Sequence, residues 1–373
     1  MDDFALDFDD LCRIWLACSE SLTHRMRDRL FARYGSASAI FENLSPDAAP
    51  LISTAAYGEL VDLKHAGLDK IMLRLKALQI SLALRNKPEY PPLLDCIPDP
   101  PDVLFYRGHM PLISGKSVAI VGSRRETRYG REQAYQIAAE LAQNGIVIIS
   151  GLARGIDTAA HKGALSVGGR TIAVLGSGLE RMYPPENEPL SQEMIRLGGA
   201  IMTELPPHTE PQAFRFPIRN RIISGMADAL LLVEAREKSG TMITVGHALV
   251  QGREVFALPG QVDAPGSVMP HRFIREGARL CTCAGDLMDD MGWQTIQAEH
   301  RNEQLRFTVA DLTDTQKKIY DALCDEVRSM EELVAVTDLD ISDLSTQLTM
   351  LEIDGFIEKL PGNLYRLTPG SKA

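Results

Sequence analysis

Short apolar runs rich in Val and Ile alternate with helix-length segments over the middle of this 373-residue chain. The first run is SVAIV at 117–121, and others follow at 146–150, 171–175, 200–204, 229–235, 254–258 and 278–282. Strands that are apolar along their whole length are typical of a parallel sheet covered by helices on both faces. The pattern therefore predicts a Rossmann-like α/β domain with a central parallel sheet over residues 112–290.

The segments on either side of this domain have other periods. Residues 1–85 carry apolar residues three and four apart, which predicts a small helical domain. Residues 86–111 contain seven prolines and are expected to form a connector without regular helix. Residues 291–310 are interpreted as a linker. Over 311–373 the pattern of three helices and a hairpin resembles a winged helix.

Charge is distributed unevenly along the chain. The net charge is −11, but residues 115–290 hold 19 basic and 19 acidic side chains, so the excess acid lies in the flanking regions. Sixteen of those 19 basic residues are arginine, whose planar fork matches phosphate oxygens. A polyanion is therefore expected to meet the middle of the chain.

Several classes of protein are not expected from this sequence. The first residues, MDDFALDFDD, form no export signal, and no apolar run reaches membrane-spanning length, so we expect a cytoplasmic protein without a membrane partner. The six cysteines show no disulfide pattern. Cys281 and Cys283 with His271 fall short of a four-ligand zinc site, so we expect neither a metal nor another cofactor.

The loops after the predicted strands are the candidate ligand sites, because ligands of open parallel sheets bind at the carboxyl ends of the strands. Gly122, Ser123 and Arg124 follow the first strand and suit a phosphate, although they do not form the GxGxxG fingerprint of dinucleotide sites. The stretch 150–155 places two glycines around an arginine, which is a possible anion-binding nest. Ser239, Gly240 and Thr241 precede a helix expected at 242–251, whose N-terminus can face an anion.

Two features leave alternatives open. Ser150, Asp157 and His161 are compatible with a catalytic relay, but the commoner explanation is a capping Asp paired with a partly buried His. The segment 214–221 interleaves aromatic and arginine side chains, as base-stacking sites do. Its alternative is a pair of core phenylalanines with solvated arginines, and the sequence does not choose between them.

Taken together, these motifs closely resemble the DprA/Smf (DNA-processing protein A) family. They are GSR, SGLARGID followed by AH, TIAVLGSGL with YPPEN, TELP, FPIRNRIISG, VEA with SGT, and VFALPG, in this order from Ser117 to Gly260. The resemblance implies a Rossmann-like domain that binds single-stranded DNA, forms a homodimer and helps a RecA-type recombinase to load during natural transformation. It also implies a SAM-like N-terminal domain.

The predicted DNA-binding residues combine this resemblance with the loop analysis. They are Gly122, Ser123, Arg124, Ser150, Gly151, Arg154, Gly155, Arg215, Arg219, Asn220, Arg221, Ser239, Gly240 and Thr241. The chain departs from the family pattern in three places: Glu210 stands where a lysine is expected, the loop 266–274 is atypical, and residues 21–24 replace a Gly-Ile-Gly turn. DNA contact by the N-terminal domain is therefore not expected.

The C-terminal region is expected to bind protein or to serve as a structural module. Residues 311–373 hold 13 acidic and 6 basic side chains, and its presumed recognition helix at 341–354 has no Lys or Arg. Phosphate would repel such a helix.

Two other functions remain as alternatives to a DNA-binding module. A nucleotide-hydrolysing enzyme would need a glutamate after Thr241 that the chain lacks, and a pure scaffold would leave the clustered arginines unexplained, so we predict that the protein is not an enzyme.

Overall fold

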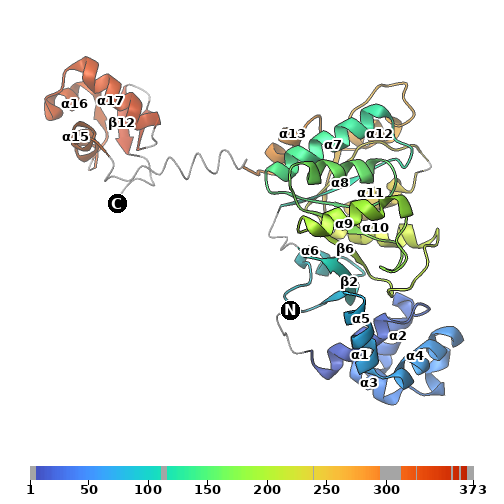
Figure 1. The fold of residues 1–373 in the computed structure, drawn as a ribbon. Helices are drawn as coiled ribbons and strands as arrows, with labels where there is room; N and C mark the ends of the chain where they lie inside the picture. The colour runs from blue at the N-terminus through green and yellow to red at the C-terminus, as the bar shows by residue number, and fades with distance from the viewer. Residues whose placement is uncertain are drawn as a thin grey trace. The chain divides into compact units, whose positions relative to one another are not determined.

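The computed structural model describes residues 6–110, 116–237, 239–294, 312–324, 326–353, 356–360 and 363–367. The chain divides into two compact units, Met1–Trp293 and Gln294–Ala373. Figure 1 shows the N-terminal helices, the sheet with its covering helices and the small C-terminal module. Within the described residues, no helix combines the length and the apolar character needed to cross a membrane.

A nine-stranded sheet is the centre of the first unit, with strand order β1-β2-β6-β5-β4-β3-β7-β8-β9. The seven strands from β3 onward are parallel, whereas β2 pairs antiparallel with β1 and with β6. This confirms the predicted fold class. The parallel strands are β3 (Ser117–Val121), β4 (Val147–Ser150), β5 (Thr171–Val174), β6 (Ala200–Thr203), β7 (Ala229–Leu232), β8 (Glu254–Ala257) and β9 (Arg279–Leu280).

Helices cover both faces of the parallel strands, as their continuous apolar character requires. One face packs against α7 (Arg128–Gln143), α8 (Ile156–Ser166) and α13 (Ala284–Asp290). The other packs against α6 (Pro92–Asp95), α10 (Arg215–Gly225), α11 (Thr241–Val250) and α12 (Val268–Arg275). Most of the atypical segment 266–274 thus lies within α12, whose Met269 and Phe273 belong to this core.

The predicted connector contributes to the sheet. Strand β2 (Val103–Gly108) lies inside residues 86–111, and β1 (Ser81–Leu84) lies at the end of the predicted helical domain. Val103 and Phe105 are buried in a core shared with α9 (Glu188–Arg196) and the N-terminal helices. The prediction of a connector without regular helix over 86–111 missed this strand, which lies between β1 and β6, and the short helix α6. A six-residue strand between prolines gives little periodic signal.

The N-terminal helices form a module around the fully buried Trp15, whose indole N–H donates to the carbonyl of Leu60 at 3.1 Å. They are α1 (Phe8–Ala17), α2 (His24–Tyr34), α3 (Ala37–Asn43), α4 (Thr54–Ala66) and α5 (Leu68–Ala77), with the 3₁₀ helix η1 (Pro46–Leu51). The module packs on the β1–β2 edge of the sheet. Residues 1–77 are helical as expected, where described.

The second unit has the predicted winged-helix composition. Its described elements are α15 (Asp314–Ala322), β10 (Arg328–Ser329), α16 (Met330–Thr337), α17 (Ile341–Ile353), β11 (Ile357–Leu360) and β12 (Leu364–Leu367). The hairpin of β11 and β12 is extended by β10, which pairs with β12. Most of the predicted linker, residues 295–310, lies outside the described residues.

Candidate functional site

A cavity of about 450 Å³ lies between the loops that follow β3 and β7. These strands are neighbours, and the chain proceeds from β3 to β4 on one side and returns to β7 on the other. Such a reversal of strand order opens a crevice at the carboxyl edge, the usual ligand site of open α/β sheets. We call this the switch-point cavity. Eight of the predicted residues line it: Gly122, Ser123, Arg124, Arg219, Asn220, Ser239, Gly240 and Thr241.

The loop after β3 is shaped by close contacts that leave Arg124 exposed. A Cβ atom at Gly122 would lie 2.6 Å from Ile156, so only glycine fits there. The hydroxyl of Ser123 accepts a hydrogen bond from the backbone N–H of Arg125 at 3.0 Å, which fixes the turn. Among the described residues Arg124 makes no ion pair, and its side chain faces the cavity. The turn therefore presents a free guanidinium at the carboxyl edge.

An aromatic ring lies beside this cation. The guanidinium of Arg124 is 5.2 Å from the ring centroid of Phe216, and that of Arg219 is 6.0 Å from the same ring. Phe216 also packs on Tyr183, with their ring centroids 5.5 Å apart. Phe216 is half-buried in the cavity wall, whereas Phe214 is 60% exposed outside it. Phe216 is therefore the ring that combines access with a cationic neighbour.

The loop after β4 is organised around an internal carboxylate. One oxygen of Asp157, Oδ2, accepts hydrogen bonds from the backbone N–H groups of Gly151 at 3.1 Å and Ala153 at 3.4 Å. The carboxylate of Asp157 thus occupies the predicted anion nest. Burial raises the pKa of Asp157 to about 6, although the positive charge of Arg219 acts to lower it. Ser150 is fully buried and donates to the carbonyl of Ile120 at 2.6 Å, so its hydroxyl is not available to DNA.

Asp157 and His161 do not form the pair suggested by their spacing. The Nδ1 atom of His161 lies 2.7 Å from the hydroxyl of Thr171, and burial lowers the pKa of His161 to about 3. Asp157 holds the preceding loop rather than capping α8, whose N-cap is Gly155. Both the relay and the capping interpretation were therefore wrong. The spacing of Asp157 and His161 is the same for a catalytic relay, for a capping pair and for the observed arrangement, so the sequence could not distinguish them.

Gly155 keeps the loops after β3 and β4 in contact. Its φ of +84° is one that favours glycine, and an added Cβ would lie 2.2 Å from the carbonyl oxygen of Ser123. A second, smaller hollow shares Arg124 and Phe216 with the switch-point cavity and is lined by Gly151 and Arg154. Gly155 lines neither of these two hollows, and it acts only through the shape of the loop. Arg154, however, pairs with Glu186.

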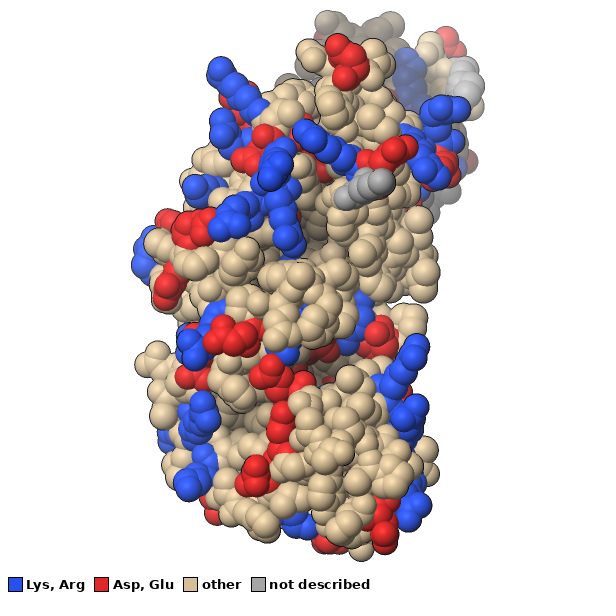
Figure 2. Space-filling model, turned by 90° about the vertical axis from the view of Figure 1, so that its right-hand side faces the viewer, with Lys and Arg blue, Asp and Glu red and all other residues tan. Residues whose placement is uncertain are grey.

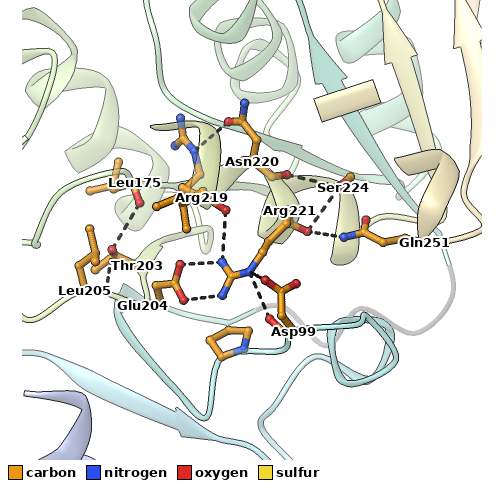
Figure 3. A network of polar contacts seen from close by, with 12 residues as sticks. Asp99, Leu175, Thr203, Glu204, Leu205, Arg219, Asn220, Arg221, Ser224 and Gln251 are labelled. Atoms are coloured by element: carbon orange, nitrogen blue, oxygen red, sulfur yellow. Dashed lines mark hydrogen bonds and ion pairs between the residues drawn. The ribbon is translucent and has the colours of Figure 1, made fainter. Parts of the chain in front are cut away.

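Helix α10 places its three arginines in different environments, two of which, those of Arg219 and Arg221, are drawn in Figure 3. Arg219 is 4% exposed and donates to the carbonyl of Gly151 at 3.0 Å, which holds α10 against the loop after β4. Arg221 points away from the cavity and pairs with Glu204 through both terminal nitrogens, at 2.6 Å each, and with Asp99 at 2.8 Å. Arg215 is buried and pairs with Glu20, which lies between α1 and α2, at 2.6 Å.

The prediction that Arg221 contacts phosphate is therefore not supported by its placement. Its side chain is 5% exposed, and two carboxylates already surround the guanidinium. Sequence analysis also missed these acidic partners, Asp99 and Glu204, because they lie far from Arg221 along the chain. Tertiary contacts alone reveal such pairing.

The N-terminus of α11 forms the opposite wall of the cavity. The hydroxyl of Thr241 donates to the carbonyl of Gly122 at 3.1 Å and so ties α11 to the loop after β3. The N-cap is Gly240, and the hydroxyl of the preceding Ser239 accepts a hydrogen bond from the backbone N–H of Thr241 at 3.2 Å. Arg125 and Arg236, which the sequence analysis did not select, also line the cavity and make no ion pair within the described residues.

Comparisons with known proteins fit this geometry. Residues 81–292 match the family described as DNA recombination-mediator protein A, and 305–363 match the DprA winged helix domain. The chain belongs to the DprA/Smf family. The family match begins at Ser81, the first residue of β1, so the edge strands form part of the shared domain.

Relatives within the DprA/Smf family cover most of the chain. Protein Smf of Escherichia coli K12 is 38% identical over 74% of this chain and 75% of its own length. DNA processing protein DprA of Bacillus subtilis is 37% identical over 66% and 83%, respectively. The solved structure of DprA from Streptococcus pneumoniae has a TM-score of 0.62 at 33% identity and covers 75% of this chain and 97% of that one.

A second solved DprA structure concerns DNA directly. It is described as showing the single-stranded DNA binding mode of DNA processing protein A from Helicobacter pylori. It has a TM-score of 0.52 at 29% identity and covers 57% of this chain and 95% of that one.

One face of this DprA/Smf-family protein is drawn in Figure 2. On this face a group of Lys and Arg side chains lies over the half of the first unit formed by the sheet, and a row of Asp and Glu runs down the other half, which also carries Lys and Arg at its sides. Within the described part of the chain, no group of three or more His, Cys, Asp or Glu side chains is arranged to hold a metal ion.

Proposed function

We propose that this protein binds single-stranded DNA in the switch-point cavity and passes the strand to a RecA-type recombinase in natural transformation and recombination. The observation that carries the proposal is Arg124, an exposed cation without an ion pair in the described structure, 5.2 Å from the ring of Phe216. A cation meets a phosphate, and the neighbouring ring stacks on a base. Bases are accessible for stacking in single strands, whereas a duplex hides their faces.

The walls of the cavity supply the remaining contacts of the proposed complex. Arg124, Arg125 and Arg236, which make no ion pair with any residue that the structure describes, offer three guanidinium groups to the phosphates. The N-terminus of α11 adds the partial positive charge of a helix end. The Helicobacter pylori structure, described as showing a single-stranded DNA binding mode, supports single-stranded DNA as the ligand.

The proposed role is binding without turnover. Asp157 is the only carboxylate among the described residues that line the cavity, and it accepts hydrogen bonds from the backbone N–H groups of Gly151 and Ala153. Helix α11, which runs from Thr241 to Val250, contains no carboxylate. A nucleotide hydrolase needs a general base that can reach water or substrate. These features favour a DNA-binding module over the hydrolase alternative.

We further propose that a second copy of the chain binds to the outer side of α11. Ile243, Leu249 and Val250 of this helix are 42%, 57% and 75% exposed. Large apolar side chains exposed together favour burial in an interface. Sedimentation velocity should give a dimer for the wild type and a monomer for Val250→Asp; a monomeric wild type would contradict the dimer. The recombinase partner rests on family membership alone.

A gel-shift titration with a single-stranded oligonucleotide and its duplex tests the DNA-binding proposal. We expect tighter binding to the single strand. Oligonucleotides and nucleoside monophosphates should remain intact after long incubation. Equal or tighter binding to the duplex would contradict the stacking argument. Cleavage that a single cavity substitution abolishes would favour the hydrolase.

A further inference from the structure

Helix α10 is fixed at its first turn by a carboxylate from the N-terminal helical module. The Nη2 atom of Arg215 lies 2.6 Å from the Oε1 atom of Glu20, and its Nη1 donates to the carbonyl of Glu210 at 3.3 Å. The Arg215 side chain is 9% exposed and that of Glu20 29%, so the cation is shielded from water and the carboxylate is partly exposed. Charge-assisted hydrogen bonds of this kind are stronger and more directional than neutral ones.

Glu20 itself stands on a well-supported turn. It lies between α1 and α2, and the side chain of Glu59 fixes that turn. Glu59 accepts hydrogen bonds from the hydroxyl of Ser19 at 2.8 Å, and from the backbone N–H of Ser21 at 3.0 Å and its hydroxyl at 2.6 Å. The neighbouring Leu22 is buried in the core of the module. The turn is therefore held from both sides before it reaches α10.

The first turn of α10 also carries a wall of the cavity. Phe216 follows Arg215 directly, and Arg219 comes one turn later, where it donates to the loop after β4. Further along the helix, Arg221 is bound by Glu204 and Asp99 (Figure 3). A short helix moves as a unit, so a shift of its first turn displaces the ring of Phe216 relative to Arg124.

We propose that Glu20 is a positioning residue for the switch-point cavity. Its ion pair with Arg215 sets the first turn of α10, and thereby Phe216, although neither Glu20 nor Arg215 contacts DNA. The N-terminal module thus acts on DNA binding through the fold. This proposal rests on the proposed function, because it concerns the affinity of the same cavity for single-stranded DNA.

Charge reversal distinguishes positioning from a direct contact of Arg215 with phosphate. Glu20→Arg alone and Arg215→Glu alone each place like charges together. The double variant Glu20→Arg with Arg215→Glu restores an ion pair with opposite polarity. If Arg215 contacted phosphate, a glutamate in its place would repel DNA, so the double variant would stay weak. If the pair positions α10, the double variant regains affinity.

The experiment measures affinity for one single-stranded oligonucleotide by fluorescence anisotropy at several salt concentrations, with melting temperatures recorded alongside. We expect Glu20→Gln and Arg215→Gln to weaken binding by about tenfold, with the salt slope unchanged. Glu20→Asp should retain part of the affinity, and the charge-reversed double variant most of it. If Glu20→Gln does not fold, Glu20→Asp and the double variant carry the test.

Asp102→Asn is the matched control. It removes the pair of Arg27 with Asp102, which also joins the helical module to the rest of the first unit and has a similar exposure, 15% and 25%, but does not involve α10. We expect this variant to bind as the wild type does.

Three results would overturn the proposal. The first is wild-type affinity in a folded Glu20→Gln. The second is a loss of about 0.7 in salt slope for Arg215→Gln together with a weak double variant, which would make Arg215 a direct contact. The third is an equal loss in Asp102→Asn, which would mean that any damage to the module weakens binding. In all three the wild type still binds single-stranded DNA. A wild type that binds none overturns the proposed function, and this inference with it.

Discussion

Arg124 and Arg221 look alike in the sequence, as arginines in two motifs of one predicted site, but the structure predicts opposite consequences for their loss. Arg124 is exposed in the cavity without an ion pair among the described residues. Arg221 is 5% exposed and bound to Glu204 and Asp99. Alanine at Arg124 should therefore act on DNA binding, and alanine at Arg221 on folding.

The size of each effect follows from the environment. Loss of one charge-assisted phosphate contact, about 1.5–3 kcal/mol, should weaken DNA binding roughly ten- to hundredfold in Arg124→Ala. It should also lower the salt slope by about 0.7, so that between 50 and 200 mM salt the wild type loses about 2.6-fold more affinity than the variant does. The melting temperature should be unchanged.

Removal of Arg221 leaves two carboxylates without their cation. The expected cost in unfolding free energy is about 3 kcal/mol, at the lower end for broken buried pairs because the Asp99 side chain is 44% exposed. At roughly 2–4 °C per kcal/mol, the melting temperature should fall by roughly 6–12 °C.

The assay combines calorimetric melting with anisotropy titrations at several salt concentrations, below the melting temperature of each variant. The folded fraction of Arg221→Ala should keep the wild-type salt slope. The reasoning is refuted if Arg124→Ala binds with wild-type affinity and slope, or if Arg221→Ala melts with the wild type but loses slope.

Three further predictions concern single features. Phe216→Ala should weaken single-strand binding by about 1–3 kcal/mol with little change in salt slope, measured by the same titrations; a slope change would indicate lost phosphate contacts instead. Burial raises the pKa of Asp157 to about 6, and a bound phosphate nearby favours the protonated, neutral form of this carboxyl. The affinity for DNA should therefore rise as the pH falls from about 7.5 to 5.5. Asp157→Asn should remove this pH dependence because the amide does not titrate, and its oxygen can still accept both backbone hydrogen bonds. A pH dependence that persists in this variant would exclude Asp157 as its source. Deletion of 313–373 should leave the gel-shift affinity equal or slightly higher, and a large loss would show that the acidic winged helix helps to bind DNA.

The parallel sheet and the location of the candidate site could both be predicted from the amino-acid sequence. Apolar runs such as Ser117–Val121 must be covered on both faces, and parallel strands bring the loops after them to one edge. Gly122, Arg124 and the segment Ser239–Thr241 could therefore be assigned to one site before the structure was known. The three helices and the hairpin of the winged helix were likewise visible as local periodicity.

Which arginines are free to meet DNA could not be predicted in this way, because it depends on contacts between distant segments of the chain. Arg219, Arg221 and Arg215 lie within two turns of one helix, yet their partners are Gly151, Glu204 and Glu20, brought close by other segments of the chain. A side chain's availability to DNA depends on what surrounds it in space, and no spacing rule records that. The same holds for β2, which is a strand because it pairs with β6. It also holds for Asp157, whose own carboxylate occupies the nest that the sequence motif predicts for an external anion.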